Sequence, residues 1–316
     1  MRVLVAGGSG AIGQALVPQL VAAGHEVAAT TRTAAKAPLL ESLGATPLVL
    51  DALDEEAVTA AVRKFRPAAL MNQLTALPQR YEPRRLGPAY EATGRLRVEG
   101  TRLLLRAAAE VGARRFVYQS IAFLYELAGP PIVDEEAPLA LHSPEPFRSI
   151  VRATSEGERL ATSAPGIEGV VLRYGQLYGP GTYFAPDGDF ARRARRRMLP
   201  ILGSGAGLSS FLHVGDAASS ALAALERGSG VYNVTDDDPA PAREWIPAFC
   251  REVGAPPPLR LPATLGRIAA GGFSTALLTD GRGASNAKAK RELGWSPLRP
   301  SWRAGFLADR RPVGRS

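Results

Sequence analysis

Cysteine and histidine are scarce in this 316-residue sequence, which contains one cysteine, Cys250, and three histidines. A single thiol excludes an internal disulfide and a cysteine-rich metal site. The histidines, His25, His142 and His213, lie far apart and lack the spacing of metal ligands. We therefore expect a protein without a structural metal.

Long apolar runs are also absent, since no stretch approaches the roughly 20 residues that cross a bilayer as a helix. Met1 leads directly into the first predicted strand, so the sequence shows no signal peptide. Both observations predict a cytoplasmic protein that does not contact a membrane.

Lysine is rare: only four of the 38 basic residues are lysines, and the net charge is +8. The densest basic run is Arg192-Arg193-Ala194-Arg195-Arg196-Arg197. We interpret this run first as the solvated face of a helix. The alternative is a clamp for an anionic substrate, because arginine binds phosphate through a two-pronged fork. Nucleic-acid binding is not favoured, because no aromatic stacking surface accompanies the charge.

Glycine, in contrast, is concentrated near the N-terminus. The apolar run Val3-Leu4-Val5-Ala6 precedes Gly7-Gly8-Ser9-Gly10-Ala11-Ile12-Gly13, where a helical pattern begins. Such a strand–turn–helix lets the backbone approach a pyrophosphate, and the helix N-terminus supplies N–H donors and a positive dipole end. The pattern predicts a dinucleotide site formed by Gly7, Ser9, Gly10, Ala11, Ile12 and Gly13.

Strand and helix patterns alternate through the first half of the chain. Strands joined by crossover helices imply an α/β fold with a doubly wound parallel sheet, whose ligands bind outside the carboxyl ends of the strands. The predicted strands are 2–6, 26–31, 46–50, 68–73 and 115–120, and the predicted helices are 12–23, 33–43, 55–64, 91–112 and 148–163.

The second half is less regular. We expect residues 1–168 to form the nucleotide-binding domain and residues 169–316 to form a mixed segment. In that segment, strands 169–175 and 230–235 return to the sheet, and the rest forms a smaller C-terminal substrate lobe with short helices. The stretch 179–210, rich in Gly, Pro and Arg, is expected to run over the cofactor edge.

Seven segments, in order along nearly the whole chain, carry a family resemblance. They are Gly7–Gly13, Val98–Thr101, Arg115–Ser120, Leu172–Gly181, Phe211–Ala218, Val231–Val234 and Arg291–Trp295. Through them the chain resembles the extended short-chain dehydrogenase/reductases, the NAD-dependent epimerase/dehydratase family. The resemblance implies a Rossmann NAD(P)-binding domain, often a homodimer, and an NAD(P)-dependent oxidoreductase or epimerase/dehydratase-like enzyme. Its substrate would be a small molecule with a carbonyl or hydroxyl group.

The cofactor preference depends on the end of the second strand. Family members that bind NAD usually carry an aspartate there, whereas this sequence reads Thr30-Thr31-Arg32. A carboxylate would repel a 2′-phosphate, and a guanidinium would bind it. Arg32, helped by Lys36, therefore favours NADP, with NAD as the alternative.

Further cofactor contacts follow from position in the family alone. The resemblance implies that Asp51 and Ala52 contact the adenine, that Leu74 and Thr75 border the ribose, and that Tyr174 and Leu177 close over the nicotinamide.

The family's catalytic pattern is broken. Its chemistry uses a Ser or Thr together with a Tyr and a Lys that lie four apart on one helix, so that both face the same side. Helix 148–163 contains neither Tyr nor Lys. One alignment places Ile150 and Thr154 at the two positions, and another places Arg148 and Arg152 there. Ile121 follows Ser120, and Arg97 replaces the usual Asn.

We therefore expect a non-standard site. Ser120 is the candidate for orienting a substrate oxygen, Tyr125 for donating a proton and Arg152 for holding an anion or polarising a carbonyl. An arginine does not release its proton at neutral pH, so Arg152 is not an acid. Further acid candidates are Tyr118, Tyr81, Tyr178 and His142, whereas His213 is expected to be structural.

Three classes of function remain open. The first is an NADP-dependent oxidoreductase or epimerase-like enzyme with a rearranged proton donor. The second is a non-redox isomerase, cyclase or lyase on the same scaffold. The third is an NADP-binding sensor without catalysis. The three classes are given in order of preference. This ranking rests on family resemblance, and a fold alone does not fix a function.

Overall fold

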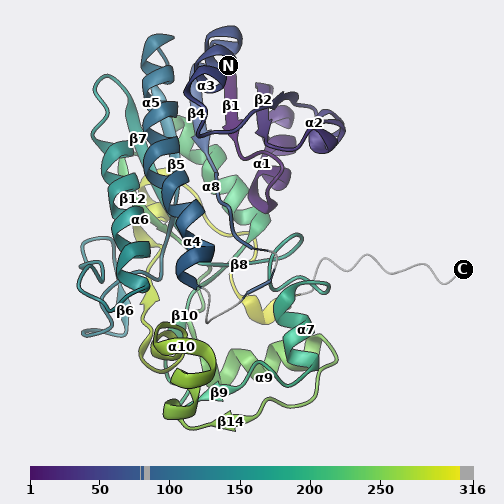
Figure 1. The fold of residues 1–316 in the computed structure, drawn as a ribbon, viewed down its shortest axis with the longest axis vertical. Helices are drawn as coiled ribbons and strands as arrows, with labels where there is room; N and C mark the ends of the chain where they lie inside the picture. The colour runs from purple at the N-terminus through teal and green to yellow at the C-terminus, as the bar shows by residue number, and fades with distance from the viewer. Residues whose placement is uncertain (79, 82–85, 307–316) are drawn as a thin grey trace, which may run out of the picture.

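The core of the protein is one seven-stranded parallel sheet, seen in a computed structural model that describes residues 1–78, 80–81 and 86–306 (Figure 1). The strand order is β12-β7-β5-β4-β1-β2-β3, and every neighbouring pair is parallel. The predicted doubly wound α/β fold is confirmed. The strands are β1 (Arg2–Ala6), β2 (Glu26–Thr31), β3 (Thr46–Val49), β4 (Ala69–Asn72), β5 (Arg115–Ile121), β7 (Glu168–Tyr174) and β12 (Gly230–Val234).

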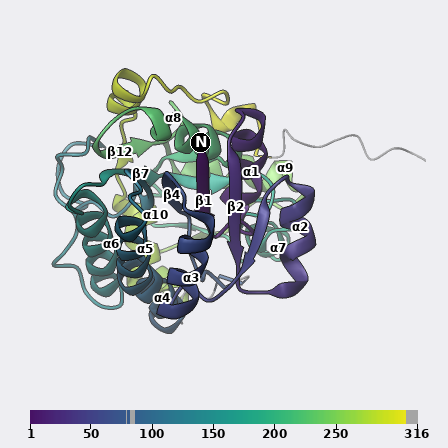
Figure 2. The same cartoon turned by 90° about the horizontal axis from the view of Figure 1, so that it is seen from above.

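Helices cover both faces of this sheet, as Figure 2 shows from above. On one face lie α1 (Ala11–Ala22) and α8 (Val214–Glu226), and on the other lie α3 (Glu55–Phe65), α5 (Thr101–Glu110) and α6 (Phe147–Thr162). A parallel sheet covered on both sides needs strands that are apolar throughout. This requirement explains the apolar run Val3–Ala6 of β1, which is buried throughout, as is the whole of β4.

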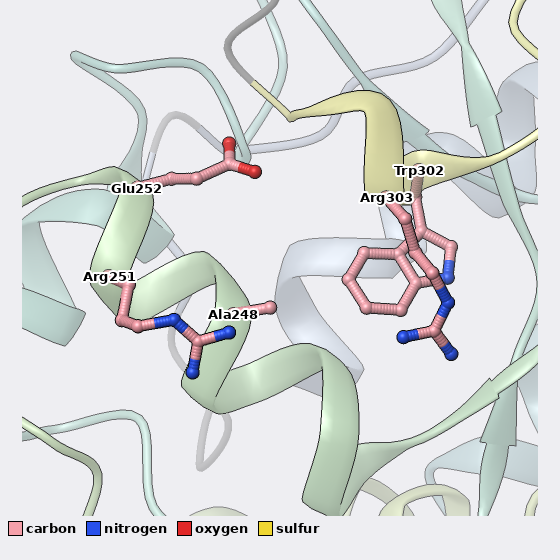
Figure 3. Close-up of a pocket in the computed structure, with 5 residues that line it drawn as sticks. All are labelled: Ala248, Arg251, Glu252, Trp302 and Arg303. Atoms are coloured by element: carbon pink, nitrogen blue, oxygen red, sulfur yellow. The ribbon is translucent and has the colours of Figure 1, made fainter.

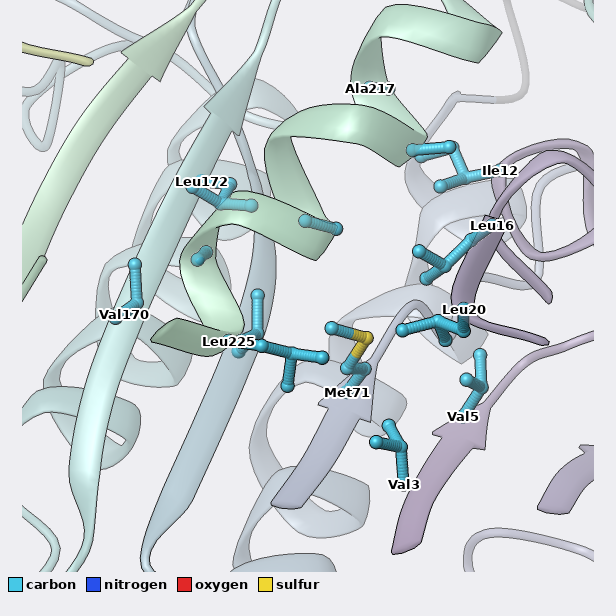
Figure 4. Close-up of a cluster of buried hydrophobic side chains, with 14 of the residues drawn as sticks. Val3, Val5, Ile12, Leu16, Leu20, Met71, Val170, Leu172, Ala217 and Leu225 are labelled. Carbon is cyan, nitrogen blue, oxygen red and sulfur yellow. The ribbon is translucent and has the colours of Figure 1, made fainter. Parts of the chain in front are cut away.

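Alternate residues of each strand point to opposite faces and supply two separate cores. Val3 and Val5 contact Leu16 and Leu20 of α1, together with α8, in the cluster drawn in Figure 4. Leu4 belongs to the cluster on the opposite face, with residues of α3 and α5. The glycine turn thus directly follows β1, whose side chains belong to both cores.

The predicted helix 91–112 is longer than expected and irregular. It consists of α4 (Leu86–Arg95), a π-helical turn (Leu96–Gly100) and α5, in direct succession. Single π turns inside helices occur frequently at functional sites. Here the turn lies beside α6 and brings Arg97 against Gly157.

The two strands predicted from the second half, β7 and β12, do join the sheet, with β7 beside β5 and β12 beside β7. The other elements of that half surround an aromatic cluster that includes Phe184, Phe211, Trp245 and Phe306. Gly271, with φ of 80°, breaks α10 into two shorter helices. The helices are α7 (Asp189–Arg195), α9 (Ala242–Glu252) and α10 (Ala263–Asp280), with short strands β8 (Gln176–Tyr178), β9 (Ile201–Leu202), β10 (Leu208–Ser209), β11 (Phe211–His213), β13 (Ala240–Pro241) and β14 (Arg260–Leu261).

The remaining short elements are α2 (Ala37–Ser42), β6 (Ile132–Val133) and β15 (Gly283–Ala284). Across the described ranges, no helix combines the length and apolar character needed to span a membrane.

Candidate nucleotide and substrate site

The glycine turn is fixed by backbone hydrogen bonds at the carboxyl end of β1. The Gly7 N–H donates to the Thr30 hydroxyl at 3.0 Å, and the Gly8 N–H donates to the Thr30 carbonyl at 3.1 Å. Gly7 has a φ of 89°, a conformation that favours glycine. These contacts connect the turn to β2 and fix its backbone at the carboxyl end of the strands.

The turn leaves no room for side chains. A Cβ at Gly13 would lie 2.5 Å from the carbonyl oxygens of both Gly7 and Gly8, and a Cβ at Gly7 would lie 2.7 Å from the Gln73 carbonyl oxygen. Helix α1 follows with Gly10 as its N-cap, which makes no side-chain capping bond. The first N–H groups of a helix, here those of Ala11, Ile12 and Gly13, have no partner within it. The residues therefore fit a pyrophosphate.

Basic side chains follow β2 directly. Arg32 and Lys36 are both exposed, and neither forms an ion pair with any residue in the described ranges. The Ser9 hydroxyl donates to the Thr31 hydroxyl at 3.1 Å, which connects the glycine turn to this end of β2. The sequence-predicted residues Ser9, Arg32 and Lys36 thus lie at one edge of the sheet.

The predicted adenine and ribose contacts follow neighbouring strands. Asp51 lies after β3, is exposed, and accepts a hydrogen bond from Leu53 N at 3.0 Å. Ala52, the next residue, is buried. Leu74 donates its N–H to Asn72 Oδ1 at 3.1 Å, and its nitrogen lies next to Gly7. Thr75 is the next residue in the same loop and is half-buried.

The two predicted nicotinamide contacts have different surroundings. Tyr174 is buried in the main core, where its hydroxyl donates to the Ala217 carbonyl at 3.4 Å and burial raises its pKa. Its ring therefore packs against α8, and a contact to the cofactor stays a prediction. Leu177 is half-buried in β8 and leaves part of its side chain accessible.

Ser120 belongs to a buried polar network that the sequence did not predict. Its hydroxyl donates to Glu158 Oε1 at 2.5 Å. Glu158 also accepts two hydrogen bonds from the Arg173 guanidinium, at 2.8 and 2.6 Å, and both side chains are 7% exposed. Burial alone would lower the pKa of Arg173, but the bonds to Glu158 raise it above its usual range. The network joins β5, α6 and β7.

Tyr125 lies at the other end of the same network. Its hydroxyl accepts from Arg173 Nη1 at 2.9 Å and donates to Asn233 Oδ1 at 2.6 Å. Burial raises the pKa of Tyr125, and the nearby Arg173 charge opposes that shift. The structure therefore brings Ser120 and Tyr125 together, but their hydroxyls are engaged inside the protein. Their catalytic roles stay predictions.

The helix that carries the family's catalytic pair is α6 in this chain, and neither alignment places a Tyr or Lys on it. Ile150 is half-buried, and Thr154 is completely buried with its hydroxyl donating to the Ile150 carbonyl at 2.8 Å. Arg152 is exposed and is not brought into the Ser120 network, and Arg148 pairs with Glu145 beside it. Neither alignment thus restores an acid on α6.

The other acid candidates have other contacts. Burial raises the pKa of Tyr118 to about 12, and the hydroxyl of Tyr81 lies 2.7 Å from that of Ser274. Tyr178 is buried in the aromatic cluster of the second half. His142 is exposed in a loop, whereas His213 caps α8 by accepting the Gly215 N–H, the structural role expected for it.

The basic run forms most of α7 and is largely used within the protein. Arg192 and Arg193 pair with Asp189, and Arg193 also donates to the Tyr81 carbonyl. Arg195 donates to the carbonyl of Val253 at 3.1 Å. Three of the five arginines thus have internal partners, which leaves little of the run for an anionic clamp.

Among the hollows lined by described residues, two differ in their distance from the glycine turn. One of about 220 Å³ lies between α9 and the 3₁₀ turn Trp302–Ala304, where Arg303 is already held by Asp238 and Glu244 (Figure 3). The other, of about 350 Å³, reaches the start of α1 through Ala11 and is also lined by Pro180 and Gly181. Pro180 and Gly181, from the segment 179–210 that was predicted to run over the cofactor edge, thus lie beside the start of α1.

No group of three or more His, Cys, Asp or Glu suited to a metal occurs among the residues whose structure is described.

Comparison with known proteins gives consistent matches. A model of the NAD dependent epimerase/dehydratase family matches residues 3–235. A Streptomyces protein named 3-diazoavenalumate denitrifying reductase is 50% identical over 309 residues, 97% of this chain and 99% of that protein. The 2-alkyl-3-oxoalkanoate reductase of Stenotrophomonas maltophilia is 29% identical over 267 residues, 81% of this chain and 77% of the relative. UDP-glucose 4-epimerase from Thermus thermophilus, solved with NAD, has a TM-score of 0.75 at 25% identity, covering 97% of this chain and 96% of that chain.

Proposed function

Because the chain belongs to the NAD-dependent epimerase/dehydratase family, we propose that it is a reductase that removes dinitrogen from a diazo carboxylate. The chain is an NAD(P)-dependent oxidoreductase or epimerase-like enzyme, and its family uses a nicotinamide cofactor. The observation that carries the finer proposal is the 50% identity, over almost the full length of both proteins, to a denitrifying reductase of a diazo compound.

Written for the aryl diazonium form of the diazo group, the reaction requires a hydride and no proton. When bound, the reduced nicotinamide supplies the hydride and becomes NAD(P)⁺. The substrate carbon that bears the diazonium group gains this hydride as a new C–H bond. The C–N bond breaks, and its electron pair leaves with N₂. Written in full, R–N₂⁺ and NAD(P)H give R–H, N₂ and NAD(P)⁺, with all atoms and charges balanced.

The composition of α6 supports this chemistry. Carbonyl reduction generates an alkoxide, which a positioned acid must protonate. The positions of the family's Tyr and Lys hold Ile150 and Thr154 in one alignment and Arg148 and Arg152 in the other, so neither supplies the acid, and the Ser120 and Tyr125 hydroxyls have internal partners. A site that only orients the substrate for hydride transfer does not need the missing acid.

The proposal is tested with the purified full-length protein, NADPH or NADH, and 3-diazoavenalumate or a carboxylated aryl diazonium salt. We expect one N₂ released for each reduced cofactor consumed. Cofactor deuterated at the transferring position should place deuterium on the former diazo carbon, and a reaction in D₂O with unlabelled cofactor should not. Cofactor consumption without N₂ release, or product labelled from D₂O, would contradict the proposal.

Carbonyl reduction is the second candidate, because the Stenotrophomonas relative is named a reductase of a 3-oxo acid. The two candidates differ in their need for a proton. A carbonyl reductase should show a solvent deuterium isotope effect clearly above 1 on kcat, whereas denitrification should show none. Turnover of 2-alkyl-3-oxoalkanoates but not of diazo acids would favour the second candidate.

We propose further that NADP is the preferred cofactor. Arg32 and Lys36 support this preference, because both are exposed beyond β2, close to the Ser9–Thr31 contact, and neither pairs with a carboxylate in the part of the chain that the structure describes. A guanidinium forms strong charge-assisted hydrogen bonds with a phosphate. NADP carries that phosphate on its adenosine ribose and NAD does not.

Replacing Arg32 with alanine is expected to raise the KM for NADPH by about 10- to 100-fold, since hydrogen bonds to charged groups contribute about 1.5–3 kcal/mol. The KM for NADH should stay within about twofold, because NADH lacks the phosphate. Steady-state kinetics with both cofactors measures the effect. Arg114→Ala is the matched control, since Arg114 is also exposed but precedes β5, at the opposite end of the sheet. Equal effects on both cofactors would contradict the prediction.

A further inference from the structure

Arg97 is a buried cation without a counter-ion. It is 6% exposed in the π-helical turn, and its Nη1 atom has no hydrogen-bond partner. Arg115 and Arg173 are buried to a similar degree, and each pairs with a glutamate. No carboxylate within residues 1–78, 80–81 and 86–306 pairs with Arg97. An unpaired buried charge is unfavourable, and a bound anion would remove that penalty.

The backbone around Arg97 places it between α4, α6 and β5. Its carbonyl oxygen lies 2.9 Å from the point that a Cβ on Gly157 would occupy, so α6 approaches the π turn closely. Its guanidinium lies beside the Tyr118 hydroxyl, where its charge opposes the burial that raises the Tyr118 pKa to about 12. Tyr118 lies in the second half of β5, two residues before Ser120.

Helix α4 leads directly into the π-helical turn that carries Arg97, and one face of α4 turns toward the predicted ribose loop. Thr93, four residues earlier, accepts a hydrogen bond from Ala76 N at 3.0 Å. Residues four apart share one helix face, so Arg97 and Thr93 lie on the same side. Ala76 directly follows Leu74 and Thr75. Arg97 therefore lies on the side of the helix that faces the loop after β4.

The cofactor phosphates have other partners farther along the sheet. The glycine turn follows β1 and Arg32 follows β2, whereas Arg97 adjoins β5. In the order β5-β4-β1-β2, three strand spacings of about 4.8 Å separate β5 from β2, roughly 14 Å in all. The anion that suits Arg97 is therefore not the 2′-phosphate.

We infer that Arg97 binds the carboxylate of the substrate and orients the diazo carbon for hydride transfer, an inference that rests on the proposed function. The family's lysine position on α6 holds no lysine, since it corresponds to the buried, uncharged Thr154 in one alignment and to the exposed Arg152 in the other. Arg97 supplies a positive charge from the neighbouring helix instead. Its planar fork matches a carboxylate, which an amide or ester of the same acid does not offer. Arg97 is thus a determinant of substrate specificity.

The inference is tested by binding, which needs no turnover. The full-length protein saturated with NADP⁺ is titrated calorimetrically with the diazo-free acid avenalumate and with its primary amide. The wild-type protein should bind the acid at least about 30-fold more tightly than the amide, and Arg97→Met should weaken acid binding by about 100-fold. Amide binding should change less than twofold, and Arg97→Lys should restore part of the acid affinity.

Arg95→Met is the matched control, because Arg95 lies on the same helix but is exposed and paired with Glu99. It should leave both affinities unchanged. Equal loss of acid and amide binding in Arg97→Met, or a tenfold weaker NADP⁺ affinity, would overturn the inference. If Arg97→Met does not fold, the wild-type affinities for the acid and the amide decide. Equal affinity for the two ligands would contradict a carboxylate site. Acid binding with no N₂ release would refute the proposed function but leave this site standing.

Discussion

Replacing Gly13 with valine is expected to abolish measurable NAD(P)H binding, with a loss of at least about 100-fold in affinity. A Cβ at this position would lie 2.5 Å from the carbonyl oxygens of Gly7 and Gly8. Those oxygens belong to the turn that must approach the pyrophosphate, so either the turn or α1 has to move. Overpacking of this kind costs about 1–3 kcal/mol in stability as well. Cofactor titration by fluorescence or calorimetry, with a melting curve for each variant, measures both effects.

Gly272→Ala provides the control for helical glycines in general. A Cβ at Gly272 in α10 meets no atom within 4 Å. Alanine should therefore leave cofactor affinity unchanged, and stability should be equal or slightly higher because alanine favours the helix. Normal cofactor affinity in Gly13→Val would refute the assignment of the pyrophosphate to this turn.

Glu158→Ala is expected to destabilise the protein by about 3–5 kcal/mol, because it leaves Arg173 as an uncompensated buried charge. The same change removes the acceptor of the Ser120 hydroxyl. Since Arg173 also donates to Tyr125, the loss of Glu158 should weaken the packing of both β5 and β7. Thermal or chemical unfolding of the variant measures the effect.

Glu156→Ala is the matched control on the same helix. Glu156 pairs with Arg159 at the surface, where both side chains are substantially exposed, so its removal should have little effect on melting. The double variant Glu158→Leu, Arg173→Met should recover much of the lost stability, because it removes both buried charges. If Glu158→Ala melted like Glu156→Ala, the network would not stabilise the fold as described.

The fold was predictable because its main features are local. Buried parallel strands are short apolar runs, and Gly7 to Gly13 mark the first crossover without reference to distant residues. The parallel, doubly wound sheet followed from the same alternation of strands and helices. The start of α4 at Leu86 and the π turn after Arg95 were missed, since neither has a signal in the periodicity.

The candidate site was only partly predictable. Ser120 and Tyr125 were predicted separately as catalytic residues, and the structure connects them through Glu158 of α6 and Arg173 of β7. No sequence spacing shows that these two charges meet in the interior. Arg97 was noticed only as a departure from the family, and its unpaired burial requires coordinates to see. Contacts between distant elements explain every miss at this site.

The position of β7 in the sheet has a consequence for synthesis on the ribosome. β5 lies between β4 and β7, so the backbone edge of β5 has no partner until residue 174 has been made. The face that α8 covers stays open for longer still, until residue 226. Unpaired strand edges and exposed apolar faces promote association between chains. Nascent chains halted between residues 121 and 168 should therefore be the species that chaperones bind most strongly.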